Sequence, residues 1–262
     1  MDLQLDGNSA LVTASSSGLG KASARALAQE GANVVMNGRD EDRLQKAVED
    51  VRADATGEVI GHSGDLTEPD DITALVDRTV DEFEGLDHLV TSAGGPPSGP
   101  FLEKSDEDWY DAFDLLVMSV VRLVRGASGP LEDGGGTVVN ITSGSVKEAI
   151  DGLVLSNSVR MSVIGLEKTL SKELAPEVRA NAVLPGIHET PRIREIIEQE
   201  IDRGEYDSYE EGLADRSSGI PNESIGDPMD LGRTVAFLSS PQSSYINGET
   251  ITLDGGAGAS NL

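Results

Sequence analysis

The amino-acid sequence predicts an α/β protein built on one doubly wound parallel sheet of about seven strands, with helices on both faces. Three observations carry this prediction. Short apolar runs rich in β-branched residues alternate with segments of helical periodicity, which is the pattern of successive βαβ units. The short runs end in polar or glycine-rich turns. The length of 262 residues suits one large α/β domain better than two small ones.

Seven short runs are the expected strands. In chain order they are SALVT (9–13), NVVMN (33–37), EVIGHS (58–63), HLVT (88–91), GTVVNIT (136–142), RANAVL (179–184) and ETITLD (249–254). Because connections between neighbouring parallel strands are right-handed crossovers, these runs are expected to assemble into a single sheet.

Helical periodicity is clear between several of these strands. Apolar residues recur at helical spacing over 70–84, behind Pro69, a residue favoured at the first position of a helix. Residues 153–170 predict another helix. The least regular stretch is about 191–226, rich in charge, glycine and serine, and we expect it to be an insertion before the last helix. No repeat or linker divides the chain, so residues 1–262 are expected to form one domain.

The composition is strongly acidic. There are 47 Asp and Glu against 20 Lys and Arg, a formal net charge of -27, which would repel nucleic acid and anionic membranes. The acidic residues are spread along the chain, which favours a solvated acidic shell over a partner-binding tail. Such a surface repels itself unless salt screens it. We therefore expect a cytoplasmic protein from a salt-adapted organism.

Several classes of site and of location are disfavoured. The chain has no cysteine, so disulfides and thiolate chemistry are excluded, and its three scattered histidines do not have the spacing of a metal site. No apolar run reaches the length of a membrane span, and the first residues have neither the basic nor the apolar region of a secretion signal. Metal binding and membrane insertion are therefore not expected.

The turn after the first strand, TASSSGLGKASARALAQEGA, predicts an anion site. It follows a strand and opens a helix, so the backbone around Gly18 and Gly20 can approach a pyrophosphate. The spacing is not that of a Walker A loop. The alternative is a purely structural tight turn. The next strand ends in Gly38 and Arg39, where a carboxylate would favour NAD(H). Arg39 favours NADP(H), because it can pair with a 2′-phosphate, unless it only balances neighbouring aspartates.

Six motifs in order resemble the short-chain dehydrogenase/reductase family over nearly the whole chain. They are TASSSGLG (13–20), GDLT (64–67), TSAGG (91–95), VNITS (139–143), PGIHET (185–190) and the closing INGETITLDGG (246–256). The segments SAGGPPSGPF (92–101) and SVKEAIDGLVLSN (145–157), together with an arginine, resemble a divergent branch described as 3-oxoacyl-carrier-protein reductase-like. The resemblance implies a Rossmann fold, a homo-oligomer (tetramer or dimer), and hydride transfer between NAD(P) and a small carbonyl or alcohol substrate. It also implies that residues 191–226 form a lid over that substrate.

The resemblance also assigns the cofactor site residue by residue. The positions that match the family's cofactor contacts are Ser16, Gly18, Leu19, Gly20, Arg39, Asp65, Leu66, Ala93, Gly94, Pro185, Gly186 and Thr190. Two neighbouring positions depart from the pattern. Ser92 replaces an asparagine, and Ala14 replaces the first glycine, which carries an energetic cost if that position needs a positive φ.

The catalytic positions match poorly. The resemblance implies a tetrad of Asn, Ser, Tyr and Lys, of which only the serine, Ser143, is kept. Ser156 stands at the tyrosine position, Arg160 at the lysine position and Leu116 at the asparagine position. The tyrosine would supply the proton for the product alkoxide, and serine is a far weaker acid. Losing a general acid is expected to slow the reaction about 10²- to 10⁴-fold. Arg160 can still hold ribose hydroxyls and stabilise negative charge.

A substitute acid is expected near Ser143. The candidate is Lys147, on the loop that faces the substrate pocket in the family. Alternatives are His188, near the nicotinamide end, and the lid tyrosines Tyr206 and Tyr209, whereas Asp151 could serve as a base only if it is desolvated. Each also has a plain structural interpretation: a solvated lysine, a surface histidine or ordinary lid packing. Two hypotheses follow, an NADP(H)-dependent oxidoreductase with a nonstandard acid and a catalytically weak or inactive relative that acts as a dinucleotide-binding or structural module.

Overall fold

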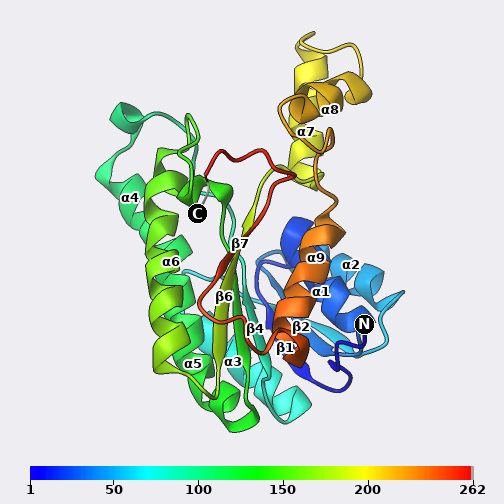
Figure 1. The fold of residues 1–262 in the computed structure, drawn as a ribbon, viewed down its shortest axis with the longest axis vertical. Coiled ribbons are helices and arrows are strands. Elements are labelled where there is room, and N and C mark those ends of the chain that lie inside the picture. Colours follow the sequence, from blue (N-terminus) through cyan, green and yellow to red (C-terminus); the bar gives the residue numbers. More distant parts are fainter. Residues whose placement is uncertain (261–262) are drawn as a thin grey trace.

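A computed structural model describes residues 1–260, and its strands form one sheet in which every pairing is parallel. The strand order is β3-β2-β1-β4-β5-β6-β7 (Figure 1). The strands are β1 (Ser9–Val12), β2 (Asn33–Gly38), β3 (Val59–Ser63), β4 (His88–Thr91), β5 (Thr137–Ile141), β6 (Arg179–Pro185) and β7 (Thr250–Leu253). The predicted α/β class and doubly wound parallel sheet are confirmed, and each strand lies within one residue of its expected limits.

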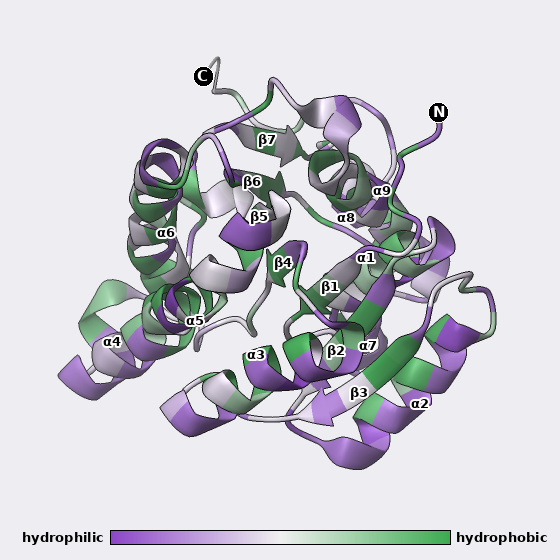
Figure 2. Cartoon of the chain, turned by 90° about the horizontal axis from the view of Figure 1, so that it is seen from below, coloured by the Kyte–Doolittle hydropathy of each residue, from purple (hydrophilic) through white to green (hydrophobic). Residues whose placement is uncertain are grey.

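Helices cover both faces of the sheet, as predicted. One face packs against α1 (Gly18–Gln29), α2 (Glu41–Arg52) and α9 (Pro228–Ser239), and the other against α3 (Pro69–Phe83), α5 (Ser119–Gly134) and α6 (Val154–Glu173). Figure 2 shows apolar strands in the centre and hydrophilic helix faces turned outward. Each layer of helices has its own apolar core against the sheet. Among residues 1–260, no helix combines the length and apolar composition needed to cross a bilayer.

Shorter elements complete the chain between these layers. They are η1 (Phe101–Glu103), α4 (Asp106–Phe113), the π-helical turn η2 (Asp114–Met118), η3 (Gly144–Val146) and η4 (Pro241–Ser243). The strand order reverses between β1 and β4, where the chain crosses from one edge of the sheet back to its middle. Loops separate at such a reversal and leave a crevice at the carboxyl ends of the strands.

The segment after β6 is more regular than the sequence indicated. The expectation of an irregular stretch at 191–226 is wrong, because α7 (Pro191–Asp202) and α8 (Tyr209–Ser217) occupy most of it. Ile197 is fully buried, and a half-buried ion pair of 2.6 Å between Arg216 Nη2 and Glu200 Oε2 joins the two helices. Figure 1 shows them standing away from the sheet. The many charged residues of this segment therefore belong to two helices rather than to an irregular loop.

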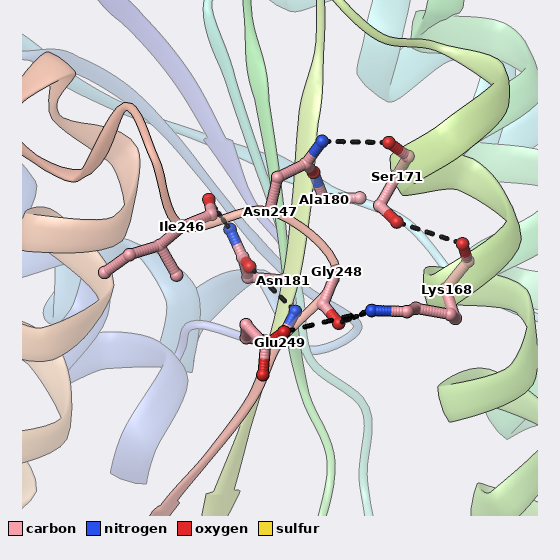
Figure 3. A network of polar contacts seen from close by, with 8 residues as sticks. All are labelled: Lys168, Ser171, Ala180, Asn181, Ile246, Asn247, Gly248 and Glu249. Atoms are coloured by element: carbon pink, nitrogen blue, oxygen red, sulfur yellow. Dashed lines mark hydrogen bonds and ion pairs between the residues drawn. The ribbon is translucent and has the colours of Figure 1, made fainter.

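The closing motif fixes β7 at the edge of the sheet through asparagine side chains (Figure 3). Asn181, on β6, donates to Ile246 O at 3.0 Å and accepts from Glu249 N at 3.1 Å. Asn247 accepts from Ala180 N at 2.9 Å and donates to Ser171 O, on α6, at 2.8 Å. The turn before β7 is therefore tied to both β6 and α6, which holds the last strand and the chain after it in place.

Candidate active site

A cleft of about 600 Å³ lies at the carboxyl ends of the strands, where the strand order reverses. Ten of the twelve residues expected to bind a cofactor line it: Ser16, Gly18, Leu19, Gly20, Arg39, Asp65, Leu66, Ala93, Gly94 and Thr190. The other two, Pro185 and Gly186, line a second cavity instead. Residues far apart in the sequence thus meet at one edge of the sheet, and their predicted role there stays a prediction.

The glycine-rich turn is shaped by one close backbone approach and one alanine in the left-handed region. A Cβ atom on Gly20 would lie 2.5 Å from Ala14 O, so no side chain fits at this position. Ala14 itself has a φ of 45°, in the left-handed region that favours glycine. The helix that follows begins after Ser17, whose side chain makes no capping hydrogen bond. The first amide groups of α1 therefore stay available for an anion in the cleft.

Asn37 joins the turn after β1 to the turn after β3 at one end of the cleft. Its Oδ1 accepts from Ala14 N at 3.2 Å, and its Nδ2 donates to Gly64 O at 3.1 Å. Asp65, on the same side, accepts from Thr67 N at 2.9 Å and Thr67 Oγ1 at 2.8 Å, and these hydrogen bonds lower the pKa of its carboxyl. The carboxylate is therefore ionised and fixed in position beside the cleft.

Two arginines follow the end of β2. Arg39 is exposed, and its Nη1 lies 3.8 Å from Asp65 Oδ2. Arg43, which the sequence interpretation missed, also lines the cleft. The available signal was its place in the first turn of the helix that follows the strand, because that turn lies at the carboxyl end of the sheet. Asp40 between them caps α2, because its Oδ1 accepts from Arg43 N at 2.9 Å.

The charge of the cleft is opposite to that of the chain. Its lining includes four arginines against two carboxylates, a formal charge of +2, whereas the whole chain carries -27. The charged residues are Arg39, Arg43, Arg160, Arg192, Asp65 and Glu195. A local excess of positive charge in an acidic protein attracts an anionic ligand.

Arg160, on α6, is a buried cation without a counterion. Its side chain lines the cleft, the residue is only 9% exposed, and its Nε has no hydrogen-bond partner within residues 1–260. Burial lowers the pKa of its guanidinium to about 10, so the group stays charged at neutral pH. A void of about 10 Å³, room for no more than one water molecule, lies beneath it. Charge of this kind is costly unless a ligand or water pairs with it.

The π-helical turn η2 places two leucines beside Arg160. Leu115 lines the cofactor-sized cleft, and Leu116, which stands at the asparagine position implied by the resemblance, lines the small void together with Ser119. Such turns within a helix often mark functional sites. Sequence reasoning missed Leu115, because a π-helical turn has no sequence signature that distinguishes it from ordinary helix.

The serine at the tyrosine position is engaged elsewhere. Ser156 is 7% exposed, and its Oγ shares a hydrogen bond of 3.0 Å with Ser145 Oγ. Ser143 lies two residues before Ser145, and its Oγ accepts from Ser145 N at 3.1 Å. The Ser143 hydroxyl hydrogen is thus free to donate to a ligand, whereas the Ser156 hydroxyl already has a protein partner.

A second cavity, of about 520 Å³, adjoins Ser143 and Lys147. Its apolar lining includes Ile150, Ile187 and Ile220. The chain after β7 borders the cavity, since Gly258 N donates to Asp254 Oδ2 at 2.9 Å and Ala259 N donates to Glu148 Oε1 at 2.5 Å. Within residues 1–260, Lys147 makes no hydrogen bond or ion pair through its side chain. The four predicted catalytic residues therefore separate: Arg160 lines the first cavity, Ser143 and Lys147 line the second, and Ser156 lines neither.

The other candidate acids have structural roles. His188 is 5% exposed, and its Nδ1 lies 3.1 Å from Gly186 O, so the expected surface position is wrong. Tyr206 donates to Asp215 Oδ2 at 2.8 Å and Tyr209 to Glu189 Oε1 at 3.0 Å, so both hydroxyls already have protein partners. Among residues 1–260, no cluster of His, Asp and Glu side chains suits a metal ion.

Comparisons with known proteins cover nearly the whole chain. A family model described as enoyl-(acyl carrier protein) reductase matches residues 13–258. The 3-oxoacyl-[acyl-carrier-protein] reductase FabG of Vibrio cholerae is 31% identical over 258 residues, which are 97% of this chain and 98% of that protein. Dehydrogenase/reductase SDR family member 4 of Homo sapiens is 33% identical over 250 residues, 94% of this chain and 86% of that protein.

Solved structures give a similar result. L-sorbose reductase from Gluconobacter frateurii, complexed with NADPH and L-sorbose, has a TM-score of 0.93 and 29% identity, covering 99% of this chain and 100% of that chain. A variant of actinorhodin polyketide ketoreductase with NADPH has a TM-score of 0.88 and 32% identity, covering 97% and 98%. A 7α-hydroxysteroid dehydrogenase complexed with NADH has a TM-score of 0.83 and 25% identity, covering 97% and 96%.

Proposed function

Because the chain belongs to the short-chain dehydrogenase/reductase family, we propose that it is an NADP(H)-dependent oxidoreductase that acts on a small carbonyl or alcohol substrate. The observation that carries the proposal is the positive cleft at the carboxyl ends of the strands, with the unpaired Arg160 buried in its wall. Relatives of similar fold bound to NADPH support it. The match to 3-oxoacyl-[acyl-carrier-protein] reductase makes 3-oxoacyl compounds a substrate class to test.

The residues present fit a dinucleotide. The cleft beside the glycine-rich turn has room for a pyrophosphate, and the uncapped start of α1 offers amide groups to it. The unpaired guanidinium of Arg160 is placed to hold ribose hydroxyls from the wall of the cleft. The cofactor supplies a hydride when it is bound, and these groups of the protein bind and orient it.

Preference for NADP(H) follows from the end of β2. The tip of the strand carries Gly38 and Arg39 where a carboxylate would accept a ribose 2′-hydroxyl, and the next residue, Asp40, caps α2 through its Oδ1. A Cβ atom on Gly38 would lie 2.9 Å from Ser16 Cβ, so a larger residue does not fit at the strand tip. Arg39 and Arg43 would pair with a 2′-phosphate instead. Replacing Arg39 with alanine is expected to weaken NADPH binding more than NADH binding in parallel titrations.

The proposed chemistry uses Ser143 and Lys147 in the second cavity. As hydride reaches the carbonyl carbon, the oxygen gains negative charge, and the free Ser143 hydroxyl donates a hydrogen bond to it. The ammonium of Lys147 then gives the oxygen the proton that completes the alcohol, and water restores that proton. Arg160 remains charged and stabilises the negative charge at a distance. The apolar lining of the cavity suits a mainly apolar substrate.

Turnover with a substrate panel tests the proposal. NADPH oxidation would be followed at molar salt with small ketones and 3-oxo thioesters. Lys147→Ala is expected to lower kcat about 10²-fold or more. Lys172→Ala, at the exposed end of α6, is the matched control and should leave kcat unchanged. Undiminished turnover by Lys147→Ala would dismiss the substitute acid.

The second candidate is a catalytically weak or inactive dinucleotide-binding module. It is favoured by the Ser156 hydroxyl, which is bonded to Ser145 and stands where the family's tyrosine would act. Tight NADPH binding without turnover on any member of the panel would establish this alternative and end the oxidoreductase proposal. Absence of NADPH binding would end the cofactor assignment in both.

We also propose a homo-oligomer, a dimer or a tetramer, in the cytoplasm of a salt-adapted organism. Four of the nine aromatic residues fall within residues 101–113, and three of these, Phe101, Tyr110 and Phe113, are exposed together with Leu102. Exposed apolar side chains gathered on one segment are typical of an interface. Light scattering coupled to size exclusion at molar salt would show a mass above that of one chain, and a monomer would contradict the proposal.

A further inference from the structure

The first turn of α7 carries an arginine that the function proposed above does not use. Arg192 follows Pro191 and lines the same cleft as the glycine-rich turn. Its Nη1 lies 3.9 Å from the position that a Cβ atom on Gly95 would occupy. Arg192 therefore reaches across the mouth of the cleft, from the chain after β6 to the loop after β4.

The guanidinium of Arg192 has no partner in the protein. Within residues 1–260 it makes no hydrogen bond or ion pair, although acidic residues outnumber basic ones by more than two to one. Other arginines of the same segment are paired: Arg194 with Glu189 at 2.7 Å, and Arg203 with Glu205 at 2.6 Å. An arginine left unpaired over a positive cleft is placed to bind an anionic group of the ligand.

Arg192 lies beside one particular part of the cleft. Thr190, two residues earlier, packs against the glycine-rich turn, with its Cγ2 3.6 Å from the position of a Cβ atom on Gly18. Arg39 and Arg43 line the part of the cleft after β2, where the proposed function places the 2′-phosphate. An anionic group that Arg192 binds therefore lies between the glycine-rich turn and the loop after β4. In a bound dinucleotide this group is the phosphate on the nicotinamide side.

We propose that Arg192 binds the nicotinamide-side phosphate of NADP(H) and so holds α7 closed over the occupied cleft. This inference rests on the proposed cofactor. The lid is braced for the task, because Glu189 accepts from Arg194 Nη2 at 2.7 Å and from Tyr209 Oη at 3.0 Å, which joins α8 to the chain that enters α7. The Arg194 guanidinium also stacks 4.7 Å from the centre of the Tyr209 ring.

Substitution of Glu195 should change NADPH affinity in the direction opposite to substitution of Arg192. Glu195 lines the same cleft one turn after Arg192, and no ion pair joins the two side chains. Its carboxylate repels a phosphate held by Arg192. Glu195→Gln is therefore expected to tighten NADPH binding, whereas Arg192→Ala weakens it.

Two ligands locate the contact. Dissociation constants for NADPH and for adenosine 2′,5′-bisphosphate, which lacks the nicotinamide-side phosphate, would be measured by calorimetry at one salt concentration. Arg192→Ala is expected to raise Kd for NADPH about 10- to 100-fold and to leave Kd for the bisphosphate unchanged. Arg192→Lys should fall between. Arg203→Ala, at the far end of α7, is the matched control and should change neither constant.

Hydrogen exchange adds a structural readout. NADPH should protect the amides of α7 and α8 in the unaltered protein and protect them less in Arg192→Ala. Unchanged NADPH affinity in Arg192→Ala, or an equal loss of both ligands, would overturn the clamp. In either case the unaltered protein would still bind NADPH, so the proposed function would stand. An unaltered protein that binds neither ligand would refute that function together with the clamp.

Discussion

Replacing Arg160 with methionine should change stability and cofactor binding in opposite directions. The guanidinium is buried, has no carboxylate partner within residues 1–260 and lines the cleft. Methionine keeps an unbranched side chain of similar reach and removes the charge. The free protein therefore loses an uncompensated buried cation, while the complex loses a ligand contact.

The pKa of Arg160 sets the scale of the first effect. Burial lowers it well below its ordinary value, to about 10. One pKa unit corresponds to about 1.4 kcal/mol, so holding the charge in the fold costs up to about 3 kcal/mol. Since the water-sized void beneath the side chain can relieve part of this cost, we expect Arg160→Met to raise the free energy of unfolding by about 1–3 kcal/mol. Tm should rise by about 2–4 °C for each kcal/mol.

The second effect has the size of a charged hydrogen bond. Such bonds contribute about 1.5–3 kcal/mol, so Kd for NADPH should rise about 10- to 100-fold in Arg160→Met. Denaturant unfolding without ligand gives the stability change, and calorimetric titration gives the affinity change. The two experiments use the same preparation and the same salt.

Arg179 provides the matched control. It is also partly buried, and burial lowers its pKa, but its guanidinium donates to Ile246 O at 3.1 Å and to Leu238 O and Ser240 O at 3.0 Å. Arg179→Met should therefore destabilise the protein by about 2–4 kcal/mol. If Arg160→Met also destabilised the free protein, the reasoning that its charge is uncompensated would be refuted.

Three further changes test other parts of the structure. Ala14→Gly should raise the free energy of unfolding by up to about 1 kcal/mol, because φ is 45° at Ala14; a lower Tm would contradict this. Burial raises the pKa of Glu167 from 4.5 to about 7, so stability present below pH 4.5 is lost as pH rises to about 7. Glu167→Gln should therefore add up to about 3 kcal/mol at pH 8 and little at pH 4.5, measured by denaturation at both. Tm should rise between 0.1 M and 1 M salt as the Debye length falls from about 10 to 3 Å, and an unchanged Tm would argue against salt adaptation.

The sheet and the glycine-rich turn were predictable because their signals are local. Each strand is a short apolar run, and burial on both faces of a parallel sheet demands that composition. Right-handed crossovers make a single parallel sheet with helices on its faces the expected assembly of such runs. The turn at 13–20 departs from the family's motif at Ala14, which replaces a glycine. Ala14 nevertheless adopts the positive φ that the glycine would favour. A local conformational requirement can therefore be inferred from one residue and its neighbours.

The rest of the site depends on contacts between distant segments. Nothing in the sequence near Ser156 indicates that its hydroxyl bonds to Ser145, because a loop of several residues separates them. Arg192 was counted within an irregular insertion, whereas its position in the first turn of α7 brings it to the cleft. His188 was expected at the surface, and the chain around Gly226 covers it, with a Cβ atom on Gly226 falling 2.7 Å from the imidazole ring. Each of these outcomes is set by packing.

Positive charge in this protein is scarce, and its placement is therefore informative. Four of the 20 basic residues line one cleft, and of these only Arg39 has a carboxylate within 4 Å among residues 1–260. An acidic surface could have neutralised all four through ion pairs, as it does for Arg194, Arg203 and Arg233. Unpaired cations lower the stability of the free protein. Binding of an anion with several charges pairs these cations and restores that stability. We therefore expect ligand binding to raise the free energy of unfolding strongly. The increase should be largest at low salt concentration, where the acidic shell is least screened.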